Sequence, residues 1–65
     1  MQIQLNGEDT QVTAMNLLDL VVELGLEQRM IAIERNMEVV PKSEYATTEL
    51  EERDRIELVH MIGGG

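Results

Sequence analysis

The residues best suited to chemistry are the glycines that close the sequence, Gly63, Gly64 and Gly65. Glycine has no Cβ and loses the most conformational freedom on ordering, so three in a row stabilise no fold. They form a thin stalk, about 10 Å long when extended, that carries a carboxylate with a reference pKa of about 3.5. Such a stalk fits a narrow enzyme channel and can present its carboxyl group there. The alternative is a disordered chain end without a function.

The remaining side chains do not form a recognisable catalytic constellation. The sequence has no cysteine, which excludes a disulfide, a thiolate nucleophile and a thiolate metal site. A single histidine, His60, cannot build a metal site or a triad alone. The charged run at residues 51–54 is expected to be a solvated turn, because short acidic turns are weak calcium sites. We therefore expect a protein substrate that binds no metal or cofactor and on which other enzymes act.

Length and charge restrict the class of protein further. A chain of 65 residues makes one small domain, and such a domain buries only about 60% of its unfolded surface. Thirteen acidic and five basic residues give a net charge of −8, which argues against nucleic-acid binding. This charge favours a partner with a basic docking surface, or serves only solubility. No apolar run approaches the roughly 20 residues of a membrane span, and no signal peptide is visible, so we expect a cytoplasmic protein.

The elements that position the glycines begin with a β-hairpin. Residues 1–5 alternate between apolar and polar types, which is the period of a half-buried strand. Asn6-Gly7 follows, and both residue types tolerate the positive φ of a tight hairpin turn. Residues 8–13 then form the returning strand, with Ile3 opposite Thr10.

A single helix is predicted after the hairpin, over residues 17–24. Asn16 is a favoured N-cap and Gly25 is a favoured stop signal. Apolar residues spaced for one face of this helix are Leu17, Leu20, Val21 and Leu24. Leu18 and Val22 lie off that face; they are expected to widen the buried stripe or, alternatively, to contact a partner.

Three strands and an irregular segment complete the pattern. Residues 31–35 and 38–40 read as strands, and Pro41 ends the second because proline offers no N–H to a ladder. A short helical turn is expected near residues 43–45, within which Tyr45 anchors the loop. Leu50 is a lone apolar residue in an acidic stretch and is expected to fill the core.

The last strand leads directly into the glycines and alternates in the same way. Ile56 and Leu58 are predicted to point inward, which leaves Val59 and Met61 on the opposite face. Exposed apolar patches commonly mark partner surfaces, and methionine adapts to irregular ones. We therefore expect Val59, Met61 and Ile62 to dock a partner, unless a helix or loop covers them.

The order strand, strand, helix, strand, short strand, loop, strand is typical of an α+β protein with a β-grasp fold. One main helix would pack across a mixed sheet of four to five strands. The first and last strands would be parallel neighbours, which requires a long crossover connection. The domain organisation is a β-grasp domain over residues 1–61 and a flexible glycine tail over residues 62–65.

Several short motifs of this chain match a known family along its whole length. These motifs are Asn6-Gly7, Glu23-Leu24-Gly25-Leu26, Val39-Val40-Pro41-Lys42-Ser43-Glu44-Tyr45, Asp54-Arg55-Ile56-Glu57-Leu58-Val59 and the final glycines. With them the chain resembles the ThiS family of thiamine-biosynthesis sulfur carriers, within the ubiquitin-like β-grasp superfamily. The stretch from Pro41 to Tyr45 and the final Gly-Gly are the specific parts of this likeness.

The resemblance implies a mechanism in which Gly65 is the modified residue. A ThiF-type adenylating enzyme would use ATP and Mg²⁺ to convert its carboxyl group into an acyl-adenylate. Sulfur from a sulfurtransferase or cysteine desulfurase would then replace AMP and leave a thiocarboxylate. A ThiG-type thiazole synthase would take up that sulfur into the thiazole ring. Gly63 and Gly64 would supply the clearance for entry into the active sites of both enzymes.

The sequence departs from the family pattern at two turns. The family often has glycine before the last strand, where this chain has Arg53, and Asn-Gly after the third strand, where it has Asn36-Met37. Both departures concern loop geometry, far in sequence from the tail.

Three other functions remain open from the sequence. The small subunit of molybdopterin synthase shares the fold, the tail and the thiocarboxylate chemistry. A ubiquitin-like modifier would be joined to lysines, and a plain β-grasp interaction module would not use its glycines. We expect a monomer when the chain is not bound to a partner.

Overall fold

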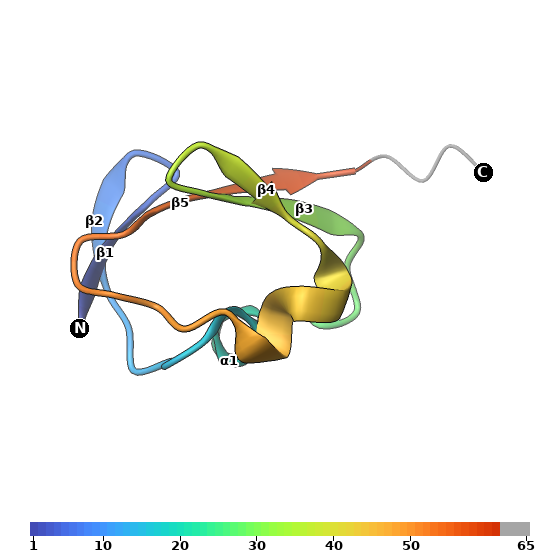
Figure 1. The fold of residues 1–65 in the computed structure, drawn as a ribbon, viewed down its shortest axis with the longest axis horizontal. Helices are drawn as coiled ribbons and strands as arrows, with labels where there is room; N and C mark the ends of the chain where they lie inside the picture. The colour runs from blue at the N-terminus through green and yellow to red at the C-terminus, as the bar shows by residue number, and fades with distance from the viewer. Residues whose placement is uncertain (62–65) are drawn as a thin grey trace.

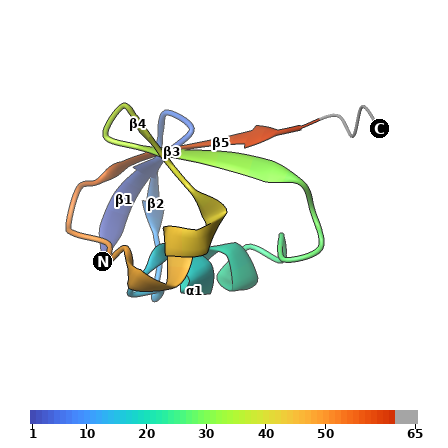
Figure 2. The ribbon, with the colours of Figure 1, turned by 45° about the vertical axis from the view of Figure 1, so that its right-hand side comes forward.

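The computed structural model describes residues 1–61, which form a five-stranded mixed sheet with its helices on one face (Figure 1). The sheet has the order β2-β1-β5-β3-β4. The strands are β1 Gln2–Leu5, β2 Glu8–Gln11, β3 Ile31–Arg35, β4 Glu38–Val40 and β5 Arg55–His60. Helix α1, Leu17–Glu23, and the 3₁₀ helix η1, Lys42–Thr47, lie together beneath the sheet (Figure 2). The predicted β-grasp fold is confirmed, with β1 and β5 as parallel neighbours.

The hairpin of β1 and β2 turns at Asn6-Gly7, as predicted. The φ angles of Asn6 and Gly7 are 49° and 85°, the left-handed values that a two-residue hairpin turn needs. Ile3 pairs with Thr10, which confirms the predicted register. Asn6 also reaches β5, because its Oδ1 accepts a hydrogen bond of 2.7 Å from the N–H of Leu58. The turn residue thereby connects the hairpin to the centre of the sheet.

Helix α1 begins and ends close to the predicted residues. The Oδ1 atom of Asn16 accepts a 2.8 Å hydrogen bond from the N–H of Asp19, and Gly25 follows the helix with a φ of 72°. The expectation that Leu18 and Val22 widen the buried stripe is wrong: they are 44% and 54% exposed. A helix of seven residues meets the sheet along a single stripe, and these two side chains project beside it.

The core lies between α1 and the inner face of the sheet. Its largest fully buried side chains are Ile3, Leu17, Leu20, Ile33 and Ile56. Leu50, between η1 and β5, is also buried and fills the core as predicted. No helix within residues 1–61 is long and apolar enough to cross a membrane.

The charged run before β5 is not merely a solvated turn, because Asp54 is buried. Its Oδ2 accepts hydrogen bonds from the Nε of Arg35, at 2.8 Å, and from the N–H of Glu51, at 2.9 Å. Its Oδ1 accepts a third, of 3.0 Å, from the side-chain amide of Asn36. Burial alone would raise the pKa of Asp54, but these donors outweigh it and hold the pKa below its ordinary value. Arg35, the ion-pair partner of Asp54, lies 19 residues away in sequence, so a local sequence pattern could not predict this contact.

The substitution Asp54→Asn should lower the free energy of unfolding at pH 7 by about 2 kcal/mol. It removes the shorter and more buried of the two ion pairs of Arg35, at 2.8 Å, and leaves only the pair with the exposed Glu51, at 3.1 Å. A carboxyl group whose folded pKa is depressed stabilises the fold fully above its unfolded pKa of about 3.9 and loses that contribution as the pH falls through the lower folded value. Urea unfolding at stepwise lower pH should therefore show the difference between wild type and variant shrinking below about pH 4. A difference that stays constant down to pH 2 would contradict this role.

The two departures from the family pattern fall at residues with left-handed backbone. The φ angles are 69° at Arg53 and 77° at Met37. A side chain other than glycine costs roughly 1 to 2 kcal/mol in that conformation. The chain therefore keeps the turn geometry that glycine would favour and bears strain at both positions.

Met37→Gly should raise the free energy of unfolding by about 1 kcal/mol, equivalent to roughly 4 to 8 °C in Tm for a domain of this size. Little packing is lost, since the Met37 side chain is 73% exposed. Met37→Ala is the matched control, because it removes the same side chain and keeps the Cβ that causes the strain. Thermal unfolding of the three proteins tests this; equal gains for Gly and Ala would show that the backbone is not strained.

Candidate functional site at the end of the last strand

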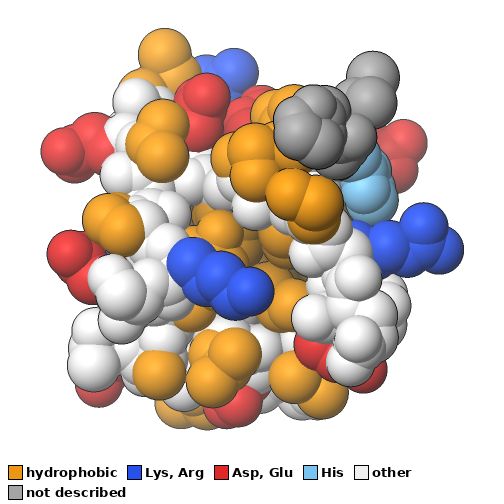
Figure 3. Space-filling model, turned by 90° about the vertical axis from the view of Figure 1, so that its right-hand side faces the viewer, with side chains coloured by type: hydrophobic (Ala, Val, Ile, Leu, Met, Phe, Trp, Pro, Cys, Tyr) orange, Lys and Arg blue, Asp and Glu red, His pale blue; other side chains and the backbone are white. Residues whose placement is uncertain are grey.

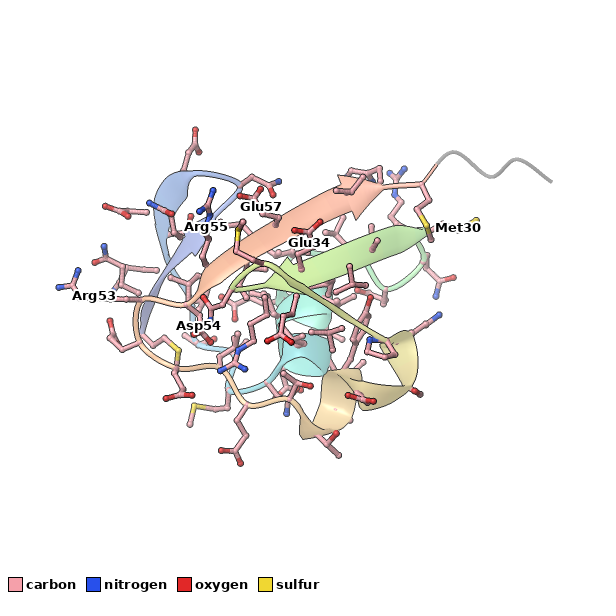
Figure 4. All side chains as sticks on the ribbon, turned by 45° about the horizontal axis from the view of Figure 1, so that its top comes forward. Met30, Glu34, Arg53, Asp54, Arg55 and Glu57 are labelled. Carbon is pink, nitrogen blue, oxygen red and sulfur yellow. The ribbon has the colours of Figure 1, made fainter. Side chains whose placement is uncertain are left out.

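Strand β5 is held by the sheet up to the last described residue. It pairs with β1 at its start, through Gln4 with Arg55 and Leu5 with Ile56. It pairs with β3 along its whole length, and beyond the strand the N–H of Met61 donates a 2.8 Å hydrogen bond to the carbonyl of Met30. Figure 4 shows Met30 beside the end of β5. The position of Met61, the last described residue before the glycines, is therefore fixed by backbone pairing.

The predicted reactive and clearance residues, Gly65, Gly64 and Gly63, lie outside the described residues, as does Ile62. Their roles stay predictions. The structure gives the place where the sheet ends and where the chain continues toward them.

The outer face of the sheet carries the exposed valine that the strand pattern indicated. Val59 is 52% exposed and pairs with Ala32 of β3. In the same strand pair Glu34 lies opposite Glu57 on this face (Figure 4). Like charges directly opposite each other on a sheet are unfavourable, and the exposed ion pair of Glu57 with Arg55, at 3.6 Å, offsets this only in part. A basic partner would therefore suit this surface.

The exposure of Val59 is confirmed. Met61 is 49% exposed but lies against the helix side, where it lines a hollow with residues of α1 and η1. The docking roles of both residues stay predictions.

A hollow of about 350 Å³ opens beside the end of β5. It lies between α1, the segment that precedes β3, and η1, and Met61 lines it. Apolar residues of its wall are Leu18, Val21, Met30, Ile31, Tyr45, Ala46 and Met61. Figure 3 shows hydrophobic side chains on its floor and a Lys or Arg side chain lying across it. The sequence did not predict this hollow, because its walls come from four separate segments. The only indication in the sequence was Leu18, an apolar residue that lies off the main apolar face of the helix.

Two cations and one carboxylate belong to the same hollow, namely Arg29, Lys42 and Glu27. All the salt bridges described for residues 1–61 involve Arg35 or Arg55, so neither Arg29 nor Lys42 takes part in one there. On a chain with a net charge of −8, the mouth of the hollow is thus locally basic.

Tyr45 anchors η1 against the core, as expected, and also contributes to the wall of the hollow. Its side chain is buried, and burial raises the pKa of its hydroxyl group. Tyr45 therefore stays neutral at physiological pH and serves as an apolar wall. Within residues 1–61, no three His, Asp or Glu side chains are grouped so that they could hold a metal ion. At this end of the domain the structure thus has a fixed position for Met61 and two surfaces beside it, the outer face of the sheet around Val59 and the hollow.

Comparison with known proteins agrees with this geometry. The sequence model of the ThiS family matches residues 3–65. The chain belongs to the ThiS family. The crystal structure of the thiamine biosynthesis protein ThiS from Geobacter metallireducens superposes with a TM-score of 0.85 at 26% identity, over 100% of both chains.

Two curated relatives differ in length. The sulfur carrier protein ThiS of Bacillus subtilis is 40% identical over 65 residues, which cover 97% of this chain and 98% of that protein. The thiazole synthase of Paramagnetospirillum magneticum is 44% identical over 66 residues, which cover 100% of this chain. The chain spans only 20% of the length of that synthase. The longer relative thus contains a region of ThiS type together with further sequence.

Proposed function

We propose that this protein is a sulfur carrier of thiamine biosynthesis whose reactive group is the carboxyl of Gly65. The observation that carries the proposal is the match to the ThiS family and to the Bacillus subtilis sulfur carrier over nearly the full length of both chains. The fold supports it, because β5 is held by its neighbours in the sheet and Met61 by Met30, so the point from which the chain continues toward Gly65 is fixed.

The proposed chemistry begins with activation, since a carboxylate is a poor electrophile. In a ThiF-type enzyme, with Mg²⁺ bound to the nucleotide, the Gly65 carboxylate attacks the α-phosphate of ATP and releases pyrophosphate. The terminal sulfur of a persulfide, supplied by a sulfurtransferase or cysteine desulfurase, then attacks the acyl carbon and AMP leaves. A second thiol cleaves the resulting S–S bond and leaves the thiocarboxylate. ATP and Mg²⁺ belong to the enzyme, and the carrier contributes the acyl group.

The partner that consumes the sulfur is proposed to be a ThiG-type thiazole synthase. Support comes from the Paramagnetospirillum magneticum protein named thiazole synthase, which contains a region similar to this whole chain. Two enzymes with different reactions must then accept the same tail. Gly63 and Gly64 suit this requirement, because a backbone without side chains passes through channels of different shape.

Incubation with ATP, Mg²⁺, the adenylating enzyme and a persulfide donor should raise the intact mass of the protein by the replacement of one oxygen with sulfur. The chain that lacks Gly64 and Gly65 should show no such change, while its Tm stays within about 2 °C of wild type, because the core of residues 1–61 is left unchanged. Intact-mass spectrometry and thermal unfolding give the two readouts. Sulfur incorporation into the shortened chain, or none into the wild type, would contradict the proposed function.

Val59→Lys should raise the KM of the adenylating enzyme for the carrier about tenfold or more, because it places a positive charge on the proposed docking face, where it would repel a basic partner. Val22→Lys is the matched control: it introduces the same charge at a valine of similar exposure, 54% against 52%, on α1 rather than on the outer face of the sheet. Steady-state rates of pyrophosphate release give the KM of the enzyme for each variant. Equal effects of the two variants would exclude Val59 from the docking surface.

A further inference from the structure

The hollow beside the end of β5 is not used by the chemistry proposed above. We propose that it is a docking site for thiazole synthase and takes a large apolar side chain of that enzyme, flanked by a carboxylate. This inference rests on the proposed function and adds a partner surface to it. It concerns the described residues alone.

The position of the hollow places it inside any complex in which the tail is held in an active site. Residues 62–65 can span at most about 13 Å when extended. An enzyme that holds the Gly65 carboxyl among its catalytic groups must therefore bring its surface close to Met61. Met61 is fixed by its hydrogen bond to Met30, and both residues line the hollow. The hollow therefore lies close to the surface of that enzyme when the tail is fully inserted.

The shape and lining of the hollow indicate an apolar occupant. Its volume of about 350 Å³ is enough for a leucine, methionine or phenylalanine side chain with part of its backbone. Leu18 is 44% exposed and shares the wall with Val21 and Ala46. Apolar anchors that enter such pockets carry much of the binding energy of protein interfaces, and burying the exposed part of Leu18 would add to it.

The charges at the mouth indicate what flanks the apolar side chain. Arg29 and Lys42 line the hollow and form no salt bridge within residues 1–61, whereas Glu27 is the single carboxylate there. An Asp or Glu on the partner would meet two cations, and this pairing would favour association and fix the orientation of the complex. The acidic outer face around Glu34 and Glu57 is left for a basic partner.

We take thiazole synthase as the occupant of the hollow because a longer relative of this chain is a thiazole synthase. In the Paramagnetospirillum magneticum thiazole synthase a region similar to 100% of this chain occupies 20% of the protein. A carrier region joined to a synthase is held close to it, and this is the reason for taking the synthase as the occupant of the hollow. The adenylating enzyme is the competing occupant and is distinguished by the tests below.

Ala46→Phe tests the hollow directly. Ala46 is exposed and lines the hollow from η1, so a phenyl ring there should fill the space that the partner needs. Affinity for thiazole synthase, measured by isothermal titration, should fall about tenfold or more. Thr47→Phe is the matched control, because it adds the same ring to the next residue of η1, outside the lining, and should change the affinity less than about twofold. Thermal unfolding checks that each variant is folded.

Lys42→Glu tests the mouth of the hollow and does not depend on how the core tolerates a new ring. It should slow association with the synthase about tenfold at low salt, and the loss should diminish as salt is added. Arg53→Glu makes the same charge change at the opposite end of the domain, as Figure 4 shows, and should have little effect. Equal slowing by both variants would overturn the local role of Lys42.

The outcomes separate this inference from the function on which it rests. Wild-type thiocarboxylate formation together with unchanged synthase affinity of Ala46→Phe and Lys42→Glu would overturn the docking site and leave the carrier function intact. Loss of adenylation in these variants without loss of synthase binding would assign the hollow to the adenylating enzyme and overturn the proposal. If the wild-type carrier did not bind the synthase, the proposal that thiazole synthase is a partner of this protein would be wrong.

The chemistry of the occupant can be read by cross-linking. The chain has no cysteine, so Ala46→Cys offers a unique attachment point for a photoreactive group at the hollow. The synthase peptide that becomes labelled should contain a large apolar residue with Asp or Glu beside it. A labelled peptide that is basic and lacks such an apolar residue would contradict the proposed occupant.

Discussion

The fold depends on the central strand β5, which two turn asparagines hold in place through their side chains. The Oδ1 of Asn6 accepts a hydrogen bond from the N–H of Leu58, and the Oδ1 of Asn36 accepts one from the N–H of Arg55. Both asparagines have positive φ, 49° and 51°, a conformation that asparagine tolerates better than most residues. Each residue therefore turns a hairpin and binds the strand between the two hairpins. The exit point of the tail is a consequence of this arrangement.

Local patterns in the sequence were sufficient to predict most of the fold. The hairpin at Asn6-Gly7, the cap at Asn16 and the stop at Gly25 are signalled by residue types whose backbone preferences act within a few positions. The parallel pairing of β1 and β5 was predicted from the order of the elements. These predictions succeeded because the local preferences and the overall topology agree.

What the sequence did not reveal depends on contacts between distant segments. Asp54 reads as part of a charged turn, and only the approach of Arg35 and Asn36 explains its burial. Leu18 fits a helical stripe equally well whether it faces the core or a hollow that η1 and the segment before β3 enclose. The departure from the family pattern at Met37 indicates an altered turn, but only its φ shows that the glycine-like turn is kept and that the residue is strained. Periodicity gives the direction of a side chain, whereas its surroundings come from the tertiary structure.

The strand order has a consequence for how the protein is made on the ribosome. Strands β1 and β3 do not pair with each other, since β5 lies between them. Before β5 emerges, the nascent chain has two separate hairpins whose inner edges have no neighbour, and an isolated hairpin is marginal in water. The sheet can close only after residues 55–60 have left the exit tunnel. The strand that leads into the glycine tail is thus also the one whose arrival completes folding.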